Sequence, residues 1–177
     1  MSSARPDPSP AVEVRPARPD ELERVGELTA RAYVVDELLP AGSDYLLELR
    51  RAAHRADHTE LLVAVDPVAG TVLGTVSFVR AGSLYADLAR GDEAEFRMLA
   101  VDPAARGRGV ATLLVLACLD RARSAGASRV VICSSSRMRT AHRLYDRLGF
   151  SRLPARDWSP SEGVQLLAYV HDLRHPA

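Results

Sequence analysis

The spacing of hydrophobic and polar residues along the chain predicts several short strands separated by helices. Val12 to Arg15 alternates apolar and polar side chains, as a strand with one buried face does. Residues 60–65 and 72–79 are β-rich runs, and the Asp66-Pro67 and Gly70 turn residues between them predict a hairpin. Further strands are predicted over residues 94–101, 129–133, 150–153 and 164–170.

Helical spacing predominates in the segments between these strands. Pro19 and the two acidic residues after it predict a helix start, because acidic side chains favour the positive end of the helix dipole. The apolar face of this helix carries Leu22, Val25, Leu28 and Tyr33. A second helix is predicted from Ser43 or Asp44 through Arg51, with Tyr45, Leu46 and Leu49 facing inward.

The helix predicted over residues 110–125 is apolar around most of its circumference, so we expect it to be buried against a sheet and to end at Gly126. A shorter helix is predicted over 140–148. The order β α α β β β α β α β β predicts an α/β fold with a mixed sheet flanked by helices. We expect this single domain over residues 11–175, after a disordered leader over 1–10 that is rich in Pro and Ser.

The amino-acid composition argues against several classes of function. The chain has 177 residues with 23 basic and 23 acidic side chains, and this balance disfavours a nucleic-acid binder that relies on basic charge. Every basic residue is Arg, so the lysine of a P-loop or of a Schiff-base enzyme is missing. Cys118 and Cys133 have no metal-ligand spacing, so we expect no metal. No secretory signal or run of about 20 apolar residues is evident, which favours a cytoplasmic protein without a membrane segment.

The most informative segment is Arg106-Gly-Arg-Gly-Val-Ala111, which lies directly between a predicted strand and a predicted long helix. A helix start has unpaired backbone N–H groups and a partial positive charge. Glycine removes the Cβ atoms that would keep a phosphate away from those groups. This arrangement therefore predicts a phosphate or pyrophosphate site. A Rossmann dinucleotide site is disfavoured, because Thr112 stands where a third small residue is needed and no acidic residue lies near Ile132.

The same segment resembles the coenzyme A loop of the GNAT superfamily of N-acetyltransferases, whose pattern is Gln/Arg-x-x-Gly-x-Gly/Ala. Arg106, Gly109 and Ala111 match its fixed positions. Met98 to Pro103 resembles the strand that leads into this loop, and Ala141 to Phe150 resembles the family's second signature, A-x-x-L-Y-x-x-L-G-F. The two signatures occur in the family's order and together cover about a third of the chain.

The resemblance implies an enzyme that transfers an acetyl group from acetyl-CoA directly to a primary amine in a ternary complex. It implies that the main chain of Leu99, Ala100 and Val101 pairs with the pantetheine arm, as an added strand would. The pyrophosphate would bind the amides of the loop, and the strand would also supply the oxyanion donor. The loop residues assigned to the donor are Arg106, Gly107, Arg108, Gly109, Val110 and Ala111. The side chains of Arg106 and Arg108 either bind phosphate or are simply solvated.

Two side chains are candidates for proton transfer. Tyr145 is on the inward face of its helix and occupies the family position that protonates the departing thiolate; pattern alone also fits a core tyrosine. Glu95 resembles the glutamate that some members use as a general base, and it equally fits an ion pair with Arg97. Strict alternation puts Glu95, Arg97 and Leu99 on one face of the strand, with Phe96, Met98 and Ala100 on the other.

The sequence says less about the residues that bind the acceptor amine than about those that bind acetyl-CoA. Met138 stands where many family members have a cofactor-contacting Asn. By analogy with the family, the acceptor is a small-molecule or peptide amine. The candidate residues for recognising it are Tyr33, Asp36, Glu37, Asp44, Asp157 and Trp158. Two alternatives remain open, a non-catalytic acyl-CoA-binding regulatory domain and the same fold using a longer acyl-CoA. The apolar last strand also suggests pairing with a second copy as a homodimer.

Overall fold

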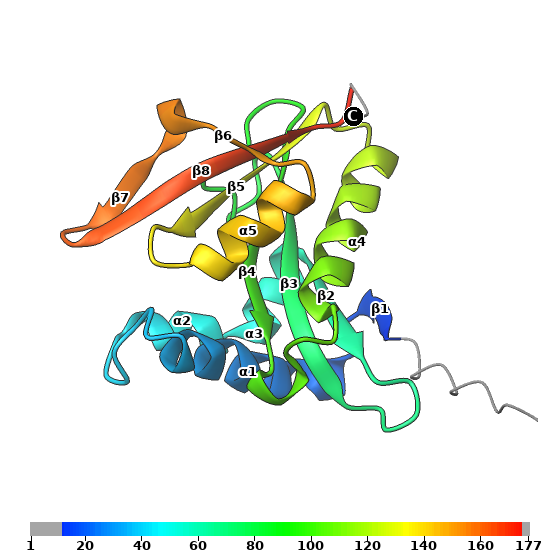
Figure 1. The fold of residues 1–177 in the computed structure, drawn as a ribbon. Coiled ribbons are helices and arrows are strands. Elements are labelled where there is room, and N and C mark those ends of the chain that lie inside the picture. The colour runs from blue at the N-terminus through cyan, green and yellow to red at the C-terminus, as the bar shows by residue number, and fades with distance from the viewer. Residues whose placement is uncertain (1–11, 175–177) are drawn as a thin grey trace, which may run out of the picture.

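A computed structural model describes residues 12–174, so the leader predicted over residues 1–10 lies outside the described residues. Figure 1 shows one sheet with helices packed on both of its faces, which confirms the predicted α/β fold. The elements in chain order are β1 (Glu13–Pro16), η1 (Pro19–Glu21), α1 (Leu22–Val35), α2 (Tyr45–Arg50), α3 (Ala52–His58), β2 (Glu60–Val65), β3 (Val72–Arg80), β4 (Ala94–Val101), η2 (Pro103–Ala105), α4 (Val110–Ser124), β5 (Arg129–Ser135), α5 (Arg139–Arg147), β6 (Ser151–Arg152), η3 (Pro154–Arg156), β7 (Trp158–Ser161) and β8 (Val164–Asp172).

The eight-stranded sheet has the order β1-β2-β3-β4-β5-β8-β6, and β7 pairs with β8 beside this path. Neighbouring strands of this sheet are antiparallel except β4 and β5, which are parallel. A parallel pair needs a crossover connection, and α4 supplies it between β4 and β5. The mixed character of the sheet therefore depends on this one crossover, which also carries the glycine-rich turn.

Two separate apolar layers cover the sheet. On one face α4 and α5 pack through buried residues such as Leu114, Leu119 and Leu144 against Val76 and Phe96. On the other face, residues of α1, α2 and α3 cover β2, β3 and the second half of β4. The long helix predicted to be buried is α4, whose Leu114, Val115, Cys118 and Ala122 are fully buried.

Three features differ from the sequence predictions. The helix expected through Arg51 is two short helices, because Arg51 leaves the helical region with φ −75° and ψ 52°, and α3 then follows. Leu46 and Leu49 face inward as expected, but Tyr45 is 38% exposed. The segment after η3, for which no strand was predicted, contains β7.

The last strand lies between other strands for most of its length. β8 pairs with β5 on one side, and with β6 and β7 on the other. This leaves little of its edge open to a second copy, and the expected homodimer stays a prediction. Within residues 12–174 no helix is both long and apolar enough to cross a membrane.

Candidate active site

The site begins where β4 and β5 separate. The two strands pair only through Ala94 with Val130 and Glu95 with Val131, and in Figure 1 they then run apart. Residues 96–101 of β4 consequently have no strand partner on the side that faces β5. Backbone N–H and C=O groups left open in this way are available to an extended ligand.

A β-bulge in β4 lies at this point of separation. Thr75 of β3 pairs with Ala100 while Ser77 pairs with Arg97, so Met98 and Leu99 together oppose one residue of β3. Met98 has φ 53°, the left-handed region that non-glycine residues seldom adopt. Bulges of this kind bend a strand and occur next to active sites.

The bulge overturns the predicted alternation of side chains along β4. Phe96 packs in the core beneath α4 and α5, as Leu99 does. Met98 and Ala100 pack instead with residues of α1 and α2 on the opposite face. The prediction that Met98 and Ala100 share a face with Phe96 is therefore wrong, because one extra residue in the strand shifts the alternation by one position.

A groove of about 700 Å³ opens between the end of β4 and the first turns of α4 and α5. This volume lies in the range of small-molecule sites in proteins. Tyr33 of α1, Asp36 directly after α1 and Met138 of the turn before α5 form part of its wall. The predicted donor-binding residues that line it are Leu99, Ala100, Val101, Arg106, Gly107, Gly109, Val110 and Ala111.

The glycine-rich turn presents unpaired amides to this groove. Gly107 and Gly109 have φ 77° and 75°, and Gly109 is the residue that precedes α4. The first N–H groups of a helix have no acceptor within the helix. No side chain caps α4, so the N–H groups of Val110, Ala111 and Thr112 have no side-chain acceptor either. Three amides at the positive end of a 15-residue helix are a ready-made anion site.

The two arginines of this turn differ in position. The Arg106 guanidinium lies 2.7 Å from the Asp36 carboxylate across the groove, which its side chain lines. Arg108 is directed toward Asp66 in the β2–β3 turn, at 3.5 Å, and is not part of the groove wall. The structure thus brings Arg106 into the candidate site and leaves the side chain of Arg108 outside it.

Tyr145 lies directly behind the groove wall. It is buried, and its ring packs against Phe96, Phe150 and Tyr169 with centroids 5.6–6.0 Å apart. Its hydroxyl forms no hydrogen bond with any residue of the described range 12–174, so no backbone group ties it down. Burial raises the pKa of Tyr145, and nearby Tyr33 and Cys133 raise it further, which keeps the phenol protonated.

Glu95 is completely buried and holds the connection between β3 and β4. Its Oε2 accepts hydrogen bonds from three successive backbone N–H groups, those of Asp87, Leu88 and Ala89, at 2.9–3.1 Å. Its Oε1 is buried without a hydrogen-bond partner. Burial raises the pKa of Glu95 above its ordinary value even though these amides and the Arg97 charge oppose the shift. The ion pair that the sequence suggested does not form, because Arg97 pairs with Asp87 at 2.7 Å.

A second hollow of about 300 Å³ lies on the other side of β4. Arg97 and Met98 line it, together with Glu48 and Tyr85. The Tyr85 hydroxyl donates to Glu48 at 2.9 Å and lies 2.6 Å from Nδ1 of His54. Glu48, Tyr85 and His54 were not predicted from the sequence, since they come from α2, a loop and α3 and no local pattern links them.

The expected acceptor residues are dispersed. Tyr33 and Asp36 line the larger groove, whereas Glu37 and Asp44 line neither hollow. Asp157 is occupied by a two-point ion pair with Arg152 and by the backbone N–H of Ala168. Trp158 lies beside the Cys133 thiol, whose pKa burial raises to about 11. Over residues 12–174 no group of three His, Cys, Asp or Glu side chains is arranged to hold a metal.

Comparison with known proteins agrees with this geometry. The model of the "Acetyltransferase (GNAT) family" matches residues 22–150. A GNAT-family acetyltransferase from Staphylococcus aureus Mu50 superposes with a TM-score of 0.73 at 13% identity, covering 92% of this chain and 99% of that one. No curated protein matches the chain.

Two further similar structures contain a coenzyme. YncA from Salmonella typhimurium, solved with acetyl-CoA, has a TM-score of 0.66 and 21% identity, with 94% of this chain and 96% of that chain covered. PaiA N-acetyltransferase from Thermoplasma acidophilum, solved with coenzyme A, has a TM-score of 0.68 and 12% identity, with 92% and 99% covered. At these identities the structures establish a shared fold.

Proposed function

This chain belongs to the GNAT family of acetyltransferases, and on that premise we propose that it transfers an acetyl group from acetyl-CoA directly to a primary amine. The observation that carries the proposal is the uncapped start of α4, whose free amides face a groove of about 700 Å³. The groove continues along the part of β4 that has no partner strand. Amides for a diphosphate and an open strand edge for an amide-containing arm are the two features that coenzyme A needs.

The donor-binding residues have distinct parts in this proposal. The N–H groups from Gly107 to Ala111 bind the pyrophosphate, whereas that of Arg106 donates to the carbonyl of Pro103. The helix dipole of α4 adds to their attraction. Arg106 exchanges part of its contact with Asp36 for a phosphate oxygen. The main chain of Leu99, Ala100 and Val101 orients the pantetheine arm and supplies an N–H group for the oxyanion.

The protonation state of Cys133 is consistent with transfer of the acetyl group directly to the amine, without a covalent intermediate on the protein. Burial raises the pKa of Cys133 to about 11, so at neutral pH this group is a thiol and a poor nucleophile. Tyr145 remains a phenol because its pKa is raised, and its unbonded hydroxyl is available to protonate the departing thiolate. A thiolate with an ordinary pKa of about 8.5 leaves reasonably well by itself, so this acid accelerates the step without being indispensable.

Glu95 is the proposed general base. An amine acceptor is mostly ammonium at pH 7 and must lose a proton before it attacks. The three loop amides hold Oε2 in place, and the unpartnered Oε1 is left to take that proton through water, since the side chain is completely buried. Burial raises the pKa of this carboxyl toward neutrality, which suits a base that works near pH 7.

The test combines donor binding with turnover. Acetyl-CoA at a hundredfold excess over its Kd is expected to stabilise the protein by about 2.7 kcal/mol in thermal unfolding. Thiol release is then followed with acetyl-CoA and a panel of amino acids, polyamines, amino sugars, aminoglycosides and peptide N-termini. Binding of acetyl-CoA without thiol release for any amine would refute catalysis. Faster thiol release from propionyl- or succinyl-CoA would show that a longer acyl-CoA is the donor. The absence of any thermal shift would refute the donor site.

A further inference from the structure

Two segments that are far apart in the sequence meet beside the buried carboxylate of Glu95. One is the connection between β3 and β4, which places Asp87 against Arg97 at 2.7 Å. The other runs from η3 into β7 and carries Trp158, which pairs with Leu166 of β8. Arg156 of this segment donates to the carbonyl of Leu88, the residue whose N–H group donates to Glu95. The two segments therefore flank the face of β4 that carries the proposed base.

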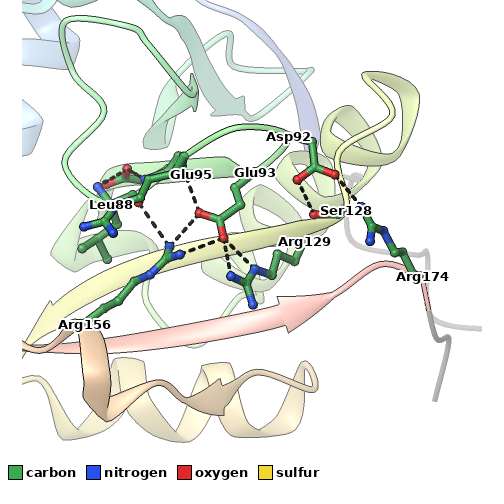
Figure 2. A network of polar contacts seen from close by, with 10 residues as sticks. Leu88, Asp92, Glu93, Glu95, Ser128, Arg129, Arg156 and Arg174 are labelled. Atoms are coloured by element: carbon green, nitrogen blue, oxygen red, sulfur yellow. Dashed lines mark hydrogen bonds and ion pairs between the residues drawn. The ribbon is translucent and has the colours of Figure 1, made fainter.

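A single buried carboxylate joins these segments. The side chain of Glu93, only 4% exposed, accepts hydrogen bonds from Arg156 of η3 at 2.6 and 3.1 Å. It also accepts one from Arg129 of β5 at 2.6 Å and one from the backbone N–H of Arg90 at 3.0 Å. Figure 2 shows this network, with Arg156 reaching in addition to the carbonyl of Leu88, at 3.3 Å.

The arginines of this network favour the charged form of the Glu93 carboxylate. Burial would raise the pKa of Glu93, but the hydrogen bonds from Arg156, Arg90 and Arg129 outweigh it and hold that pKa below its ordinary value. A buried ion pair of this kind offers little net stability, because desolvation of the charges offsets their attraction. Its clearest consequence is geometric, since a two-point contact between a guanidinium and a carboxylate fixes both distance and orientation.

We propose that the Arg156–Glu93 bridge positions Trp158 and the β3–β4 connection as the two walls that receive the acceptor amine. Arg156 and Glu93 are thus positioning residues for acceptor binding. The inference rests on the proposed acetyl transfer, and it adds which residues shape the acceptor side. The donor groove lies outside this network, since neither residue lines it.

The segment that carries Trp158 has a second set of contacts besides the Arg156–Glu93 bridge, so the effect of losing the bridge can be measured in a folded protein. Asp157, between Arg156 and Trp158, is held by Arg152 at 2.7 and 2.9 Å and by the backbone N–H of Ala168. Loss of the Arg156 contact therefore leaves the segment attached to β8. What is lost is its fixed distance from the β3–β4 connection, so the surroundings of the Trp158 ring are expected to change while β7 stays paired with β8.

The experiment compares Arg156→Gln with Arg156→Lys and with Arg174→Gln. Arg174 pairs with Asp92 in the same connection but at an exposed position away from η3, so it is a matched control (Figure 2). Trp158 is the only tryptophan of the chain, and its fluorescence therefore reports directly on this segment. The readouts are the KM of the best amine of the panel, the KM of acetyl-CoA, and the Trp158 emission maximum with its quenching by iodide.

For R156Q we expect the amine KM to rise about tenfold or more, since displaced binding groups lose affinity steeply. The KM of acetyl-CoA is expected to stay within about twofold. Trp158 emission should shift to longer wavelength with stronger iodide quenching. R156K should give smaller changes in the same direction, because lysine keeps the charge without the planar fork. R174Q should change none of the three.

An unchanged amine KM and unchanged Trp158 emission in folded R156Q would overturn the proposal. Equal increases in both KM values would overturn it as well, since they indicate general loosening. If R156Q does not fold, R156K decides: wild-type values for the amine KM and for Trp158 would refute the positioning role. If the wild-type protein acetylates no amine, the proposed function fails. The fluorescence comparison then still tests the position of Trp158.

Discussion

Gly109 is the position where the donor site is most open to a quantitative test. It precedes α4 with φ 75°, and an added Cβ would meet no atom within 4 Å. The cost of Gly109→Ala is therefore backbone strain alone, about 1–2 kcal/mol for an L-residue in the left-handed region. At about 2–4 °C per kcal/mol for a chain of this size, the melting temperature should fall by about 2–8 °C.

Gly126→Ala provides the matched control at the other end of the same helix. Gly126 has φ 72° and equally open space, so its strain is similar. It lies beyond the C-terminus of α4, and the groove is at the N-terminus. We expect both variants to lose similar stability, because the same backbone conformation is disfavoured in each.

Only Gly109→Ala should weaken donor binding. If the turn relaxes to relieve the strain, the amides of Val110 and Ala111 rotate away from the groove. A hydrogen bond to a charged group contributes about 1.5–3 kcal/mol, so loss of one corresponds to about a 10- to 100-fold rise in the Kd of acetyl-CoA. Isothermal titration of both variants with acetyl-CoA measures this. Equal Kd values for G109A and G126A would show that these amides do not bind the donor.

Three further predictions concern side chains. Tyr145→Phe should lower kcat by about 10- to 100-fold in a thiol-release assay, and its melting temperature should change little because the hydroxyl has no partner among the described residues; an unchanged kcat would exclude the acid role. For Glu95→Gln we expect the acidic limb of the kcat/KM profile to disappear, since burial raises the pKa of Glu95 and protonation inactivates the base. Because the pKa of Glu95 is raised in the folded protein, the free energy of unfolding of the wild type should fall as the pH rises from the ordinary glutamate pKa to the raised one. Urea titrations at several pH values should show no such fall for E95Q. Arg106→Gln should weaken acetyl-CoA binding several-fold while Arg108→Gln does not, because only Arg106 lines the groove; equal effects in calorimetry would contradict that assignment.

Local features of the chain were predictable because they depend on neighbouring residues. The bounds of β2, β4 and α4 follow closely from alternation and helical spacing. The glycine-rich turn is similar, since its strand, its two left-handed glycines and its helix start are consecutive. A phosphate site built from backbone amides needs only this local order, so residues 106–111 can be proposed as one from the sequence alone, and that role stays a prediction.

Helix α3 shows where local patterns are insufficient. Its Arg55 is fully buried, donating to the carbonyls of Glu48 and Leu49 at the end of α2 at 3.0 and 2.7 Å. An arginine is ordinarily assigned to the surface, and only the carbonyls of another helix make its burial tolerable. Those partners are set by how α2 and α3 pack on the sheet.

The sequence by itself determined the order of most elements, the turn at the start of α4 and the two family signatures, because each is encoded within a short stretch of chain. Tertiary structure decided how the chemistry is placed. The bulge at Met98, the amides that hold Glu95 and the bridge from Arg156 to Glu93 all join strands to distant loops. The physical reason is that hydrogen bonds and ion pairs depend on distance in space, and the path of the whole sheet sets that distance.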